Sequence, residues 1–355
     1  MDRAQIEQRI ARGDVFEEES WDGLDLAGLD LGGSVLSRVS MLGTRLSGAR
    51  LSEVTFSQCD LGEAKLDGVA MRHANLVQCQ ARGAKLDGAN MTAANLIETD
   101  FTGASLGGAD LTIANVSDCR FNRASLAKAN LDRSAFVGAT FDDVDLSGAN
   151  LRKATMFRAD LRKAKLDGAN FDTTIFTESN LAGQNFRKQS MPLVQFIDAN
   201  LEGAHFDEAM IEQVSFKGAK LAKASFTRAR AKQAIFLQAT LTVASLAGAD
   251  LFQAIFQEAS AEGADLSGAR LEQSIWIRAK CRAAKFVRCD LTYADFSHAD
   301  LSLADLSGAK MFRTRLHRAR NEGTILPPGS AAALGDEELQ VEAEDWWERH
   351  RPKRT

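Results

Sequence analysis

The stretch ADFSHADLSLADLSGAKM, residues 294–311, carries the pattern that decides the fold. An apolar residue recurs at every fifth position, here Phe296, Leu301, Leu306 and Met311, and an alanine lies two positions before each of them. The spacing holds at 59 consecutive positions from Leu26 to Leu316, and the residue two positions earlier is small at 55 of them. Strict self-similarity over such a length indicates a repeat architecture.

A period of five fits neither a regular helix nor a flat strand. In a helix every fifth residue lies about 140° further round the axis, and in a flat strand the apolar set would alternate between the two faces. A chain that turns a corner every five residues satisfies the pattern, with each pentad forming one side of a square. Four sides make a 20-residue coil, and coils stacked at roughly 4.8 Å would build a rod roughly 70 Å long.

A second, longer period supports the square coil, because residues of one kind recur four pentads apart. Glycine at a corner can adopt φ > 0, stacked amides can hydrogen-bond along a column, and stacked rings can fill one inner face. The glycine column is 28, 48, 68, 88, 108, 148, 168, 248, 268 and 308; the glutamine column is Gln213, Gln233, Gln253 and Gln273; the aromatic column is Phe176, Phe196, Phe216, Phe236, Phe256, Trp276 and Phe296.

These motifs resemble the pentapeptide repeat family and its A(D/N)LXX pattern. Literal matches are Ala-Asn-Leu at 74–76, 149–151 and 199–201, and Ala-Asp-Leu at 109–111, 249–251, 299–301 and 304–306. The resemblance covers about residues 22–320. It implies an all-β fold, a right-handed quadrilateral parallel β-helix with short terminal helices. It does not imply an activity, since members of one fold differ in function.

The extent of the five-residue repeat divides the chain into four segments. We expect an N-terminal capping helix in 1–20, the β-helix in 21–321, a linker in 322–335 and a C-terminal helix and tail in 336–355. Ile6 and Ile10 are four apart among polar residues, which predicts a short helix over about 2–12.

Two places leave the interpretation open. The C-terminal helix, predicted over 336–350, carries Trp346 and Trp347; either these pack on the last coil as a cap, or the helix docks a partner or a second subunit. Gln184 and Gln189 replace the small inward residue shortly before Pro192, and this predicts a local bulge or bend between about 182 and 194.

The sequence offers little for catalysis. Its five histidines, His73, His205, His298, His317 and His350, are spread along the chain at outward positions, and no phosphate-binding loop occurs. Cys59, Cys79, Cys119, Cys281 and Cys289 fall at inward positions, where small buried side chains are expected rather than a disulfide or metal site. We therefore predict no enzyme, no catalytic residue, no cofactor and no metal. No apolar run could span a membrane and no signal sequence is recognised, so the expected location is cytoplasmic.

One function associated with this resemblance is mimicry of DNA toward gyrase or another topoisomerase. The charge of the chain argues against it. A phosphate mimic needs a dense negative field. The repeat region holds 34 acidic and 36 basic residues, so the net charge of −5 comes from the two ends of the chain. A local acidic stripe keeps DNA mimicry as the alternative function: Asp60, Asp100, Asp142, Asp143 and Asp160.

The outward positions of one face are instead apolar. Ten such residues in one lengthwise stripe exceed the scatter expected of single surface residues and predict a protein-binding surface. β-Propensity of Ile and Val alone is the competing explanation. The stripe is Ile97, Val137, Phe157, Ile175, Ile197, Ile235, Leu237, Ile255, Ile275 and Ile277, to which the candidate docking residues Trp346 and Trp347 are added.

These observations predict a non-enzymatic scaffold or adaptor that binds other proteins, with a homodimer as one form of that binding and with neither nucleic acid nor membrane as a direct partner. The opening segments IARGD (10–14) and LDLAGLDL (24–31) resemble pentapeptide proteins encoded with bacterial type VI secretion components. That resemblance implies an adaptor or effector-loading role.

Overall fold

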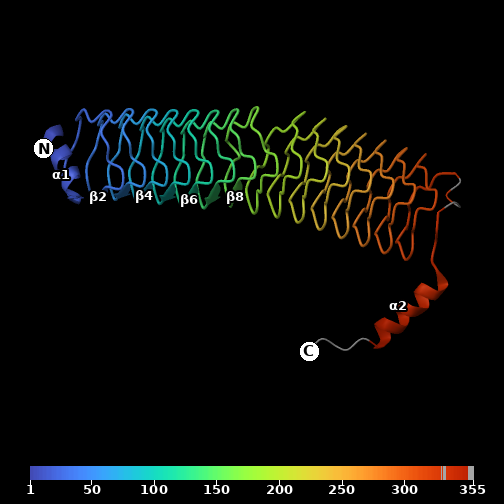
Figure 1. The fold of residues 1–355 in the computed structure, drawn as a ribbon. Coiled ribbons are helices and arrows are strands. Elements are labelled where there is room, and N and C mark those ends of the chain that lie inside the picture. Colours follow the sequence, from blue (N-terminus) through green and yellow to red (C-terminus); the bar gives the residue numbers. More distant parts are fainter. Residues whose placement is uncertain (329, 331–332, 351–355) are drawn as a thin grey trace. The chain divides into compact units, whose positions relative to one another are not determined.

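The computed structural model describes residues 1–328, 330 and 333–350, and the chain divides into two units that are described one by one (Figure 1). Unit 1 comprises Met1–Ala182 and Ser190–Asn200, and unit 2 comprises Gly183–Gln189 and Leu201–Thr355. The last residues of the predicted tail, 351–355, and residues 329 and 331–332 of the predicted linker lie outside the described residues.

Both units are stacks of the predicted four-sided coil. Parallel bridges join each side of a coil to the equivalent side of the next coil, as in Asp25↔Arg45 and Asp30↔Arg50 of unit 1 and Ile235↔Ile255 of unit 2. Successive bridges start one pentad apart, so that each side of the square carries its own column of pairings. The predicted pentapeptide-repeat β-helix with short terminal helices is thereby confirmed.

One side of unit 1 is regular enough to form a sheet. Its strands lie in chain order and each pairs in parallel with the next, in a register of one full coil, as Val35↔Thr55 shows (Figure 1). No helix among the described residues is long and apolar enough to cross a bilayer. The elements are α1 (Arg3–Arg12), β1 (Phe16–Glu17), β2 (Val35–Ser37), β3 (Thr55–Ser57), β4 (Asn75–Val77), β5 (Asn95–Ile97), β6 (Asn115–Ser117), β7 (Ala135–Val137), β8 (Thr155–Phe157) and α2 (Glu338–His350).

The inward set of the sequence is the core of the structure. Every fifth residue from Leu26 to Met311 is buried. In unit 2 the aromatic column stacks face to face: Phe236 lies 5.0 Å from Phe216 and 4.7 Å from Phe256, between ring centroids. Stacking of like residues keeps the core close-packed from coil to coil.

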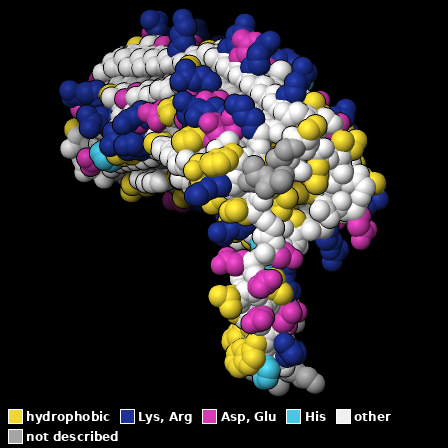
Figure 2. Space-filling model, turned by 90° about the vertical axis from the view of Figure 1, so that its right-hand side faces the viewer, with side chains coloured by type: hydrophobic (Ala, Val, Ile, Leu, Met, Phe, Trp, Pro, Cys, Tyr) yellow, Lys and Arg dark blue, Asp and Glu magenta, His cyan; other side chains and the backbone are white. Residues whose placement is uncertain are grey.

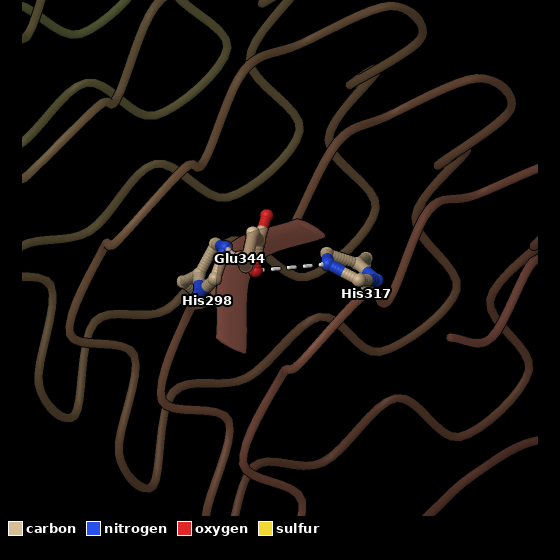
Figure 3. A group of neighbouring side chains, drawn as sticks. All are labelled: His298, His317 and Glu344. Atoms are coloured by element: carbon tan, nitrogen blue, oxygen red, sulfur yellow. Dashed lines mark hydrogen bonds and ion pairs between the residues drawn. The ribbon is translucent and has the colours of Figure 1, made fainter. Parts of the chain in front are cut away.

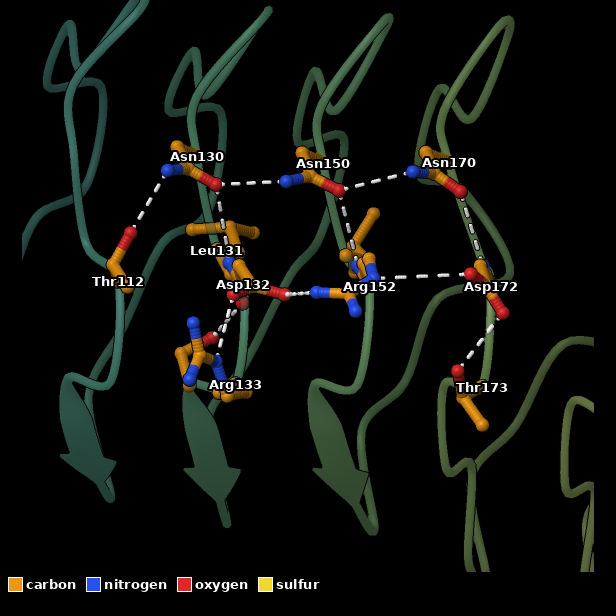
Figure 4. Close-up of polar contacts among 12 residues, drawn as sticks. Thr112, Asn130, Leu131, Asp132, Arg133, Asn150, Arg152, Asn170, Asp172 and Thr173 are labelled. Carbon is orange, nitrogen blue, oxygen red and sulfur yellow. Dashed lines mark hydrogen bonds and ion pairs between the residues drawn. The ribbon is translucent and has the colours of Figure 1, made fainter.

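The recurring polar residue of the A(D/N)L motif caps the turns. In unit 1 the side-chain oxygens of Asn130, Asn150 and Asn170 each accept the backbone N–H two residues later, at 3.1–3.3 Å (Figure 4). The same amides bond one another along the column, Asn150 Nδ2 to Asn130 Oδ1 at 2.9 Å and Asn170 Nδ2 to Asn150 Oδ1 at 3.1 Å. The side chain of the motif therefore accepts hydrogen bonds from backbone N–H groups of the turns, which would otherwise bond only to water.

The corners are more uniform than the glycine column predicts. In pentad after pentad the residue two after the central one has φ > 0, whether it is glycine (Gly248, φ 67°) or a residue with a β-carbon (Gln233, φ 57°; Val243, φ 57°). Ladder hydrogen bonds hold these strained corners, as in Gln233 N–H to the Phe252 carbonyl at 2.9 Å. The predicted glutamine ladder is confirmed, with Nε2–Oε1 distances of 2.8–2.9 Å from Gln213 to Gln273.

Of the bulge or bend predicted between about 182 and 194, the bulge is wrong, and the bend stays a prediction. The turn pattern continues through 181–200 with no inserted residue, and the Pro192 carbonyl accepts the Thr173 N–H at 3.0 Å. Proline is tolerated because its missing N–H falls at a turn position. At that position the carbonyl, and not the backbone nitrogen, takes part in the hydrogen bonds between coils. Gln184 is buried as its inward position requires.

The first coil is covered by α1. Asp2 caps this helix with a complete capping box, Gly13 ends it in the left-handed conformation, and Ile6 is buried. The Arg9 guanidinium lies 4.6 Å above the Phe16 ring. At the other end the ladder of hydrogen bonds continues beyond the last five-residue repeat. The Leu334 N–H donates to the Thr314 carbonyl, and the Leu334 carbonyl accepts the Leu316 N–H.

Three of the five cysteines, Cys59, Cys79 and Cys289, place their thiols against a carbonyl of the preceding coil. The thiol of Cys59 lies 3.4 Å from the Leu36 carbonyl, and that of Cys79 lies 3.4 Å from the Phe56 carbonyl, each in the preceding coil. The hydroxyl of Thr99 takes the same place at 3.2 Å from the Leu76 carbonyl. These thiols therefore belong, with the Thr99 hydroxyl, to a set of small inward side chains that bond to the neighbouring coil. All five cysteines are free and buried.

The aromatic column yields a stability prediction. Phe236→Ala is expected to lower the free energy of unfolding by about 3–5 kcal/mol, because transfer energy is lost and the ladder prevents the walls of the cavity from collapsing. Lys232→Ala, which removes only an exposed ion pair with Asp250, is expected to cost about 0.5 kcal/mol or less. Urea melts of both variants measure the difference, and equal losses would contradict the assigned inward phase.

The buried thiols yield a reactivity prediction. Burial raises the pKa of Cys119 and of Cys289 to about 12. The thiolate is the reactive form, so both groups stay protonated at pH 8 and are expected to resist iodoacetamide in the folded chain. Mass spectrometry after alkylation should show full modification only when denaturant is added. Rapid labelling of the folded chain would show that these side chains are accessible.

Candidate protein-binding surface

The apolar stripe predicted from the sequence is more shielded than an outward position suggests. In unit 1, Ile97 and Val137 are exposed, whereas Phe157, Ile175 and Ile197 are half-buried. In unit 2 all five members are half-buried, and we call them the isoleucine patch: Ile235, Leu237, Ile255, Ile275 and Ile277. Neighbouring coils contribute to this shielding, because Ile235 pairs with Ile255 and Ile255 with Ile275 in the ladder.

The isoleucine patch has a rigid base. Parallel bridges join Ile235 to Ile255 and Ile255 to Ile275, so these side chains repeat at the strand spacing of roughly 4.8 Å. Within each pentad the patch residues flank the buried ring of the aromatic column, as Ile235 and Leu237 flank Phe236. A partner that covers the patch would bury apolar surface on a backbone that is already ordered.

The second candidate surface lies on α2. Trp346 is 56% exposed and Trp347 is 59% exposed, and no residue of α2 is buried. Of the two alternatives left open by the sequence, the cap with both tryptophans packed on the last coil is therefore wrong. Figure 2 shows hydrophobic side chains gathered toward the end of α2, beside a histidine.

Charged groups rather than tryptophans join α2 to the last coils of unit 2. Arg318 pairs with Asp345, approaches Glu344 at 3.2 Å and donates to the Val341 carbonyl at 3.2 Å. The backbone N–H of Arg318 also donates to Asp336, just before the helix, at 2.6 Å. Because the helix is held by its polar side, the tryptophan rings stay available to a partner.

One group of side chains was missed by sequence reasoning. His298 and His317, predicted to be isolated and solvated, lie with ring centroids 5.5 Å apart, and Glu344 of α2 reaches both (Figure 3). His317 is 1% exposed, so the expectation for this residue is wrong. The coil period places the two histidines on adjoining coils but one position out of step, and the structure joins them through the His298 N–H, which donates to the His317 carbonyl at 2.8 Å.

Two members of the acidic stripe, Asp100 and Asp160, are paired with arginine side chains. Asp100 is buried and pairs with Arg82 at 2.7 Å and Arg120 at 3.8 Å. Burial acts to raise the pKa of Asp100, but hydrogen bonds from Thr102 and Arg82 outweigh it and hold that pKa below its ordinary value. Asp160 pairs with Arg162 at 2.6 Å. Arginines thus neutralise two of the five carboxylates of the stripe, whereas Asp142 and Asp143 are exposed.

Several solved structures match the chain in part of their sequence and structure. HetL, a pentapeptide repeat protein involved in heterocyst differentiation regulation from the cyanobacterium Nostoc sp. strain PCC 7120, is 24% identical over 93% of this chain and 99% of its own, with a TM-score of 0.21. A pentapeptide repeat protein from the thylakoid lumen of Arabidopsis thaliana is 30% identical over 30% of this chain and 71% of its own, with a TM-score of 0.24.

Full-length QnrB1, a plasmid-mediated fluoroquinolone resistance protein, is 17% identical over 58% of this chain and 93% of its own, with a TM-score of 0.27. No curated protein matches the chain. The function has to be argued from the surfaces described above.

Family models match most of the β-helix. The model of pentapeptide repeats matches, in eight copies, residues 22–52, 49–86, 74–112, 119–156, 156–188 and 277–319, and the model of a pentapeptide repeat region matches residues 189–266. Both models describe the repeat, and neither describes a catalytic domain. With the four-sided coil and the inward apolar beat in place, the chain belongs to the pentapeptide repeat family.

Proposed function

We propose that the chain is a non-enzymatic scaffold that binds other proteins through the isoleucine patch and the tryptophan end of α2. The observation that carries this proposal is the exposure of Trp346 and Trp347 on a helix that is anchored by its polar side. Tryptophan is enriched in protein interfaces and at their hot spots. Ile175 and Ile197, half-buried in unit 1, are the corresponding candidates there.

Rigidity supports the isoleucine patch as a binding surface. Association costs free energy when side chains and loops must be ordered, and here the ladder and the aromatic column hold the backbone beneath the patch. At about 25 cal/mol per Å² of apolar area, covering the patch supplies several kcal/mol before the cost of association. A partner strand or helix that lies along the coils suits this geometry.

The finer proposal concerns the class of partner. The opening segments 10–14 and 24–31 resemble pentapeptide proteins encoded with type VI secretion components, so we place the scaffold as an adaptor or effector-loading component of a bacterial secretion system. The support is that resemblance together with the candidate protein-binding surfaces. Its partners are then secretion components or their cargo, and a second copy of the chain is a further candidate.

DNA mimicry toward a topoisomerase is the competing function. The arginine partners of Asp100 and Asp160 weaken the negative field that such a mimic requires. A gyrase supercoiling assay with the purified chain separates the two functions, because a scaffold leaves supercoiling unchanged. Inhibition that is lost when Asp142 and Asp143 are replaced by asparagine would favour the mimic.

The interface prediction uses a paired substitution. Ile255→Asp together with Ile275→Asp places two charges in the centre of the isoleucine patch and is expected to weaken partner binding or self-association by about a hundredfold or more, which is about 2.8 kcal/mol. Capture from lysate followed by mass spectrometry identifies the partner, and light scattering reports self-association. The melting temperature should fall only slightly, because the side chains do not fill the core.

The matched control is Gln253→Asp together with Gln273→Asp, which introduces the same charges one corner away and should keep the partner. Trp346→Ala with Trp347→Ala tests the second surface in the same assay. If the isoleucine variant unfolds, the patch is structural. If it stays folded and keeps both its partner and its oligomeric state, the patch is not an interface.

A further inference from the structure

Three potential metal ligands meet where α2 contacts the last coils of unit 2 (Figure 3). His317 Nε2 lies 3.3 Å and His298 Nε2 lies 3.5 Å from Oε2 of Glu344. One ligand atom from each residue lies within 4.8 Å of the others, and no other group of three or more such residues occurs in the described part of the chain. His317 is buried, whereas His298 and Glu344 are half-buried.

The fold itself brings these residues together. The two histidines lie on adjoining coils, joined by the hydrogen bond from the His298 N–H to the His317 carbonyl, and their rings are nearly perpendicular at 87°. Glu344 arrives from α2, which the contacts of Arg318 with Asp345 and Val341 hold in place. The histidine positions are therefore as rigid as the ladder, and the carboxylate closes the group from one side.

The distances match a small tetrahedral ion. Zn²⁺ binds histidine nitrogen and carboxylate oxygen at about 2.0–2.2 Å, which places neighbouring ligands roughly 3.3–3.5 Å apart. Both histidine-to-glutamate distances fall in this range, and the two histidine nitrogens, which lie within 4.8 Å of each other, move into it when the ion binds. Two histidines and one carboxylate form a known donor set for Zn²⁺, with the fourth position left to water.

We propose that His298, His317 and Glu344 bind one Zn²⁺ ion and that this ion fastens α2 to the end of the β-helix. Because the ligands come from two coils and a helix that follows them, binding free energy becomes free energy of docking for α2. The site uses neither the isoleucine patch nor the two tryptophans, so the proposal stands whether or not the scaffold function does.

A second observation supports the site. Nδ1 of His317 is buried and makes no hydrogen bond, while Oδ1 of Asp336 lies 3.5 Å from it. When Nε2 binds an ion, the ring proton sits on Nδ1, where it faces this carboxylate. Carboxylate groups placed behind a metal-bound histidine orient its ring and raise its basicity. Asp336 thus positions His317 from the side opposite the ion.

One contact competes with the ion. Arg318 Nε lies 3.2 Å from the same oxygen of Glu344, and Gln340 donates to the other oxygen at 3.0 Å. In the absence of the ion, the guanidinium balances the carboxylate. When the ion binds, Arg318 gives up this contact and keeps Asp345 and the Val341 carbonyl. The exchange makes the site reversible and sensitive to chelators.

The test uses the full chain, stripped with a chelator that is then removed, and titrated with ZnCl₂ in a calorimeter. One ion per chain with a Kd below about 10 µM is expected. Glu344→Gln, which keeps the shape but removes the charge, and His298→Ala should each weaken binding more than tenfold. His73→Ala, an exposed histidine in unit 1, is the matched control and should bind as the unchanged chain does.

Hydrogen exchange of residues 338–350 supplies a second readout that does not depend on affinity. Zn²⁺ should slow exchange in α2 of the unchanged chain and of His73→Ala, and leave it unchanged in Glu344→Gln. Circular dichroism confirms that each variant is folded. No binding at one ion per chain, or binding by Glu344→Gln and His298→Ala equal to that of the unchanged chain, would overturn the proposal.

Discussion

The backbone ladder between coils is the constraint on which the rest of the structure depends. The central residue of a pentad donates its N–H to a carbonyl of the next coil, as Leu26 does to Arg45 at 2.8 Å and Phe236 does to Ile255 at 2.7 Å. This register requires every coil to have the same length and every corner to turn alike. It also places each side chain against its equivalent in the next coil, so that rings stack on rings and amides bond amides.

Such regularity explains why so much could be predicted. The inward apolar residue of each pentad, the glutamine ladder and the aromatic column all follow from the stacking of identical coils along one direction. In the sequence this stacking is visible as two nested periods, the pentad and the coil of four pentads. The corners were less predictable, because the ladder imposes φ > 0 on Val243 and Gln233 as firmly as on Gly248. A glycine in the sequence marks a corner because glycine readily adopts a positive φ. At the other corners the hydrogen bonds between coils impose the same positive φ on residues that do not favour it.

The ends of the chain could not be predicted in the same way, because no period connects them to the coils. The two tryptophans suggested a cap, yet Arg318 and its carboxylate partners hold α2, and the rings are exposed. Likewise, His298 and His317 fall one position out of step with the coil period, and Glu344 joins them only through the path of the chain after Leu334. Contacts of this kind depend on the three-dimensional course of an irregular segment.

The ladder also limits where function can reside. Inward positions are committed to packing, and many outward carboxylates next to the turns cap N–H groups or pair with arginines, as Asp132 does with Arg133 and Arg152 (Figure 4). A surface whose charges are paired from coil to coil has a weak long-range field. Recognition must then rest on shape and apolar contact, which in unit 2 are offered by the isoleucine patch and by α2. These surfaces differ in one respect, because the patch is fixed by the ladder while α2 is held by a few ionic contacts that a partner or an ion can exchange.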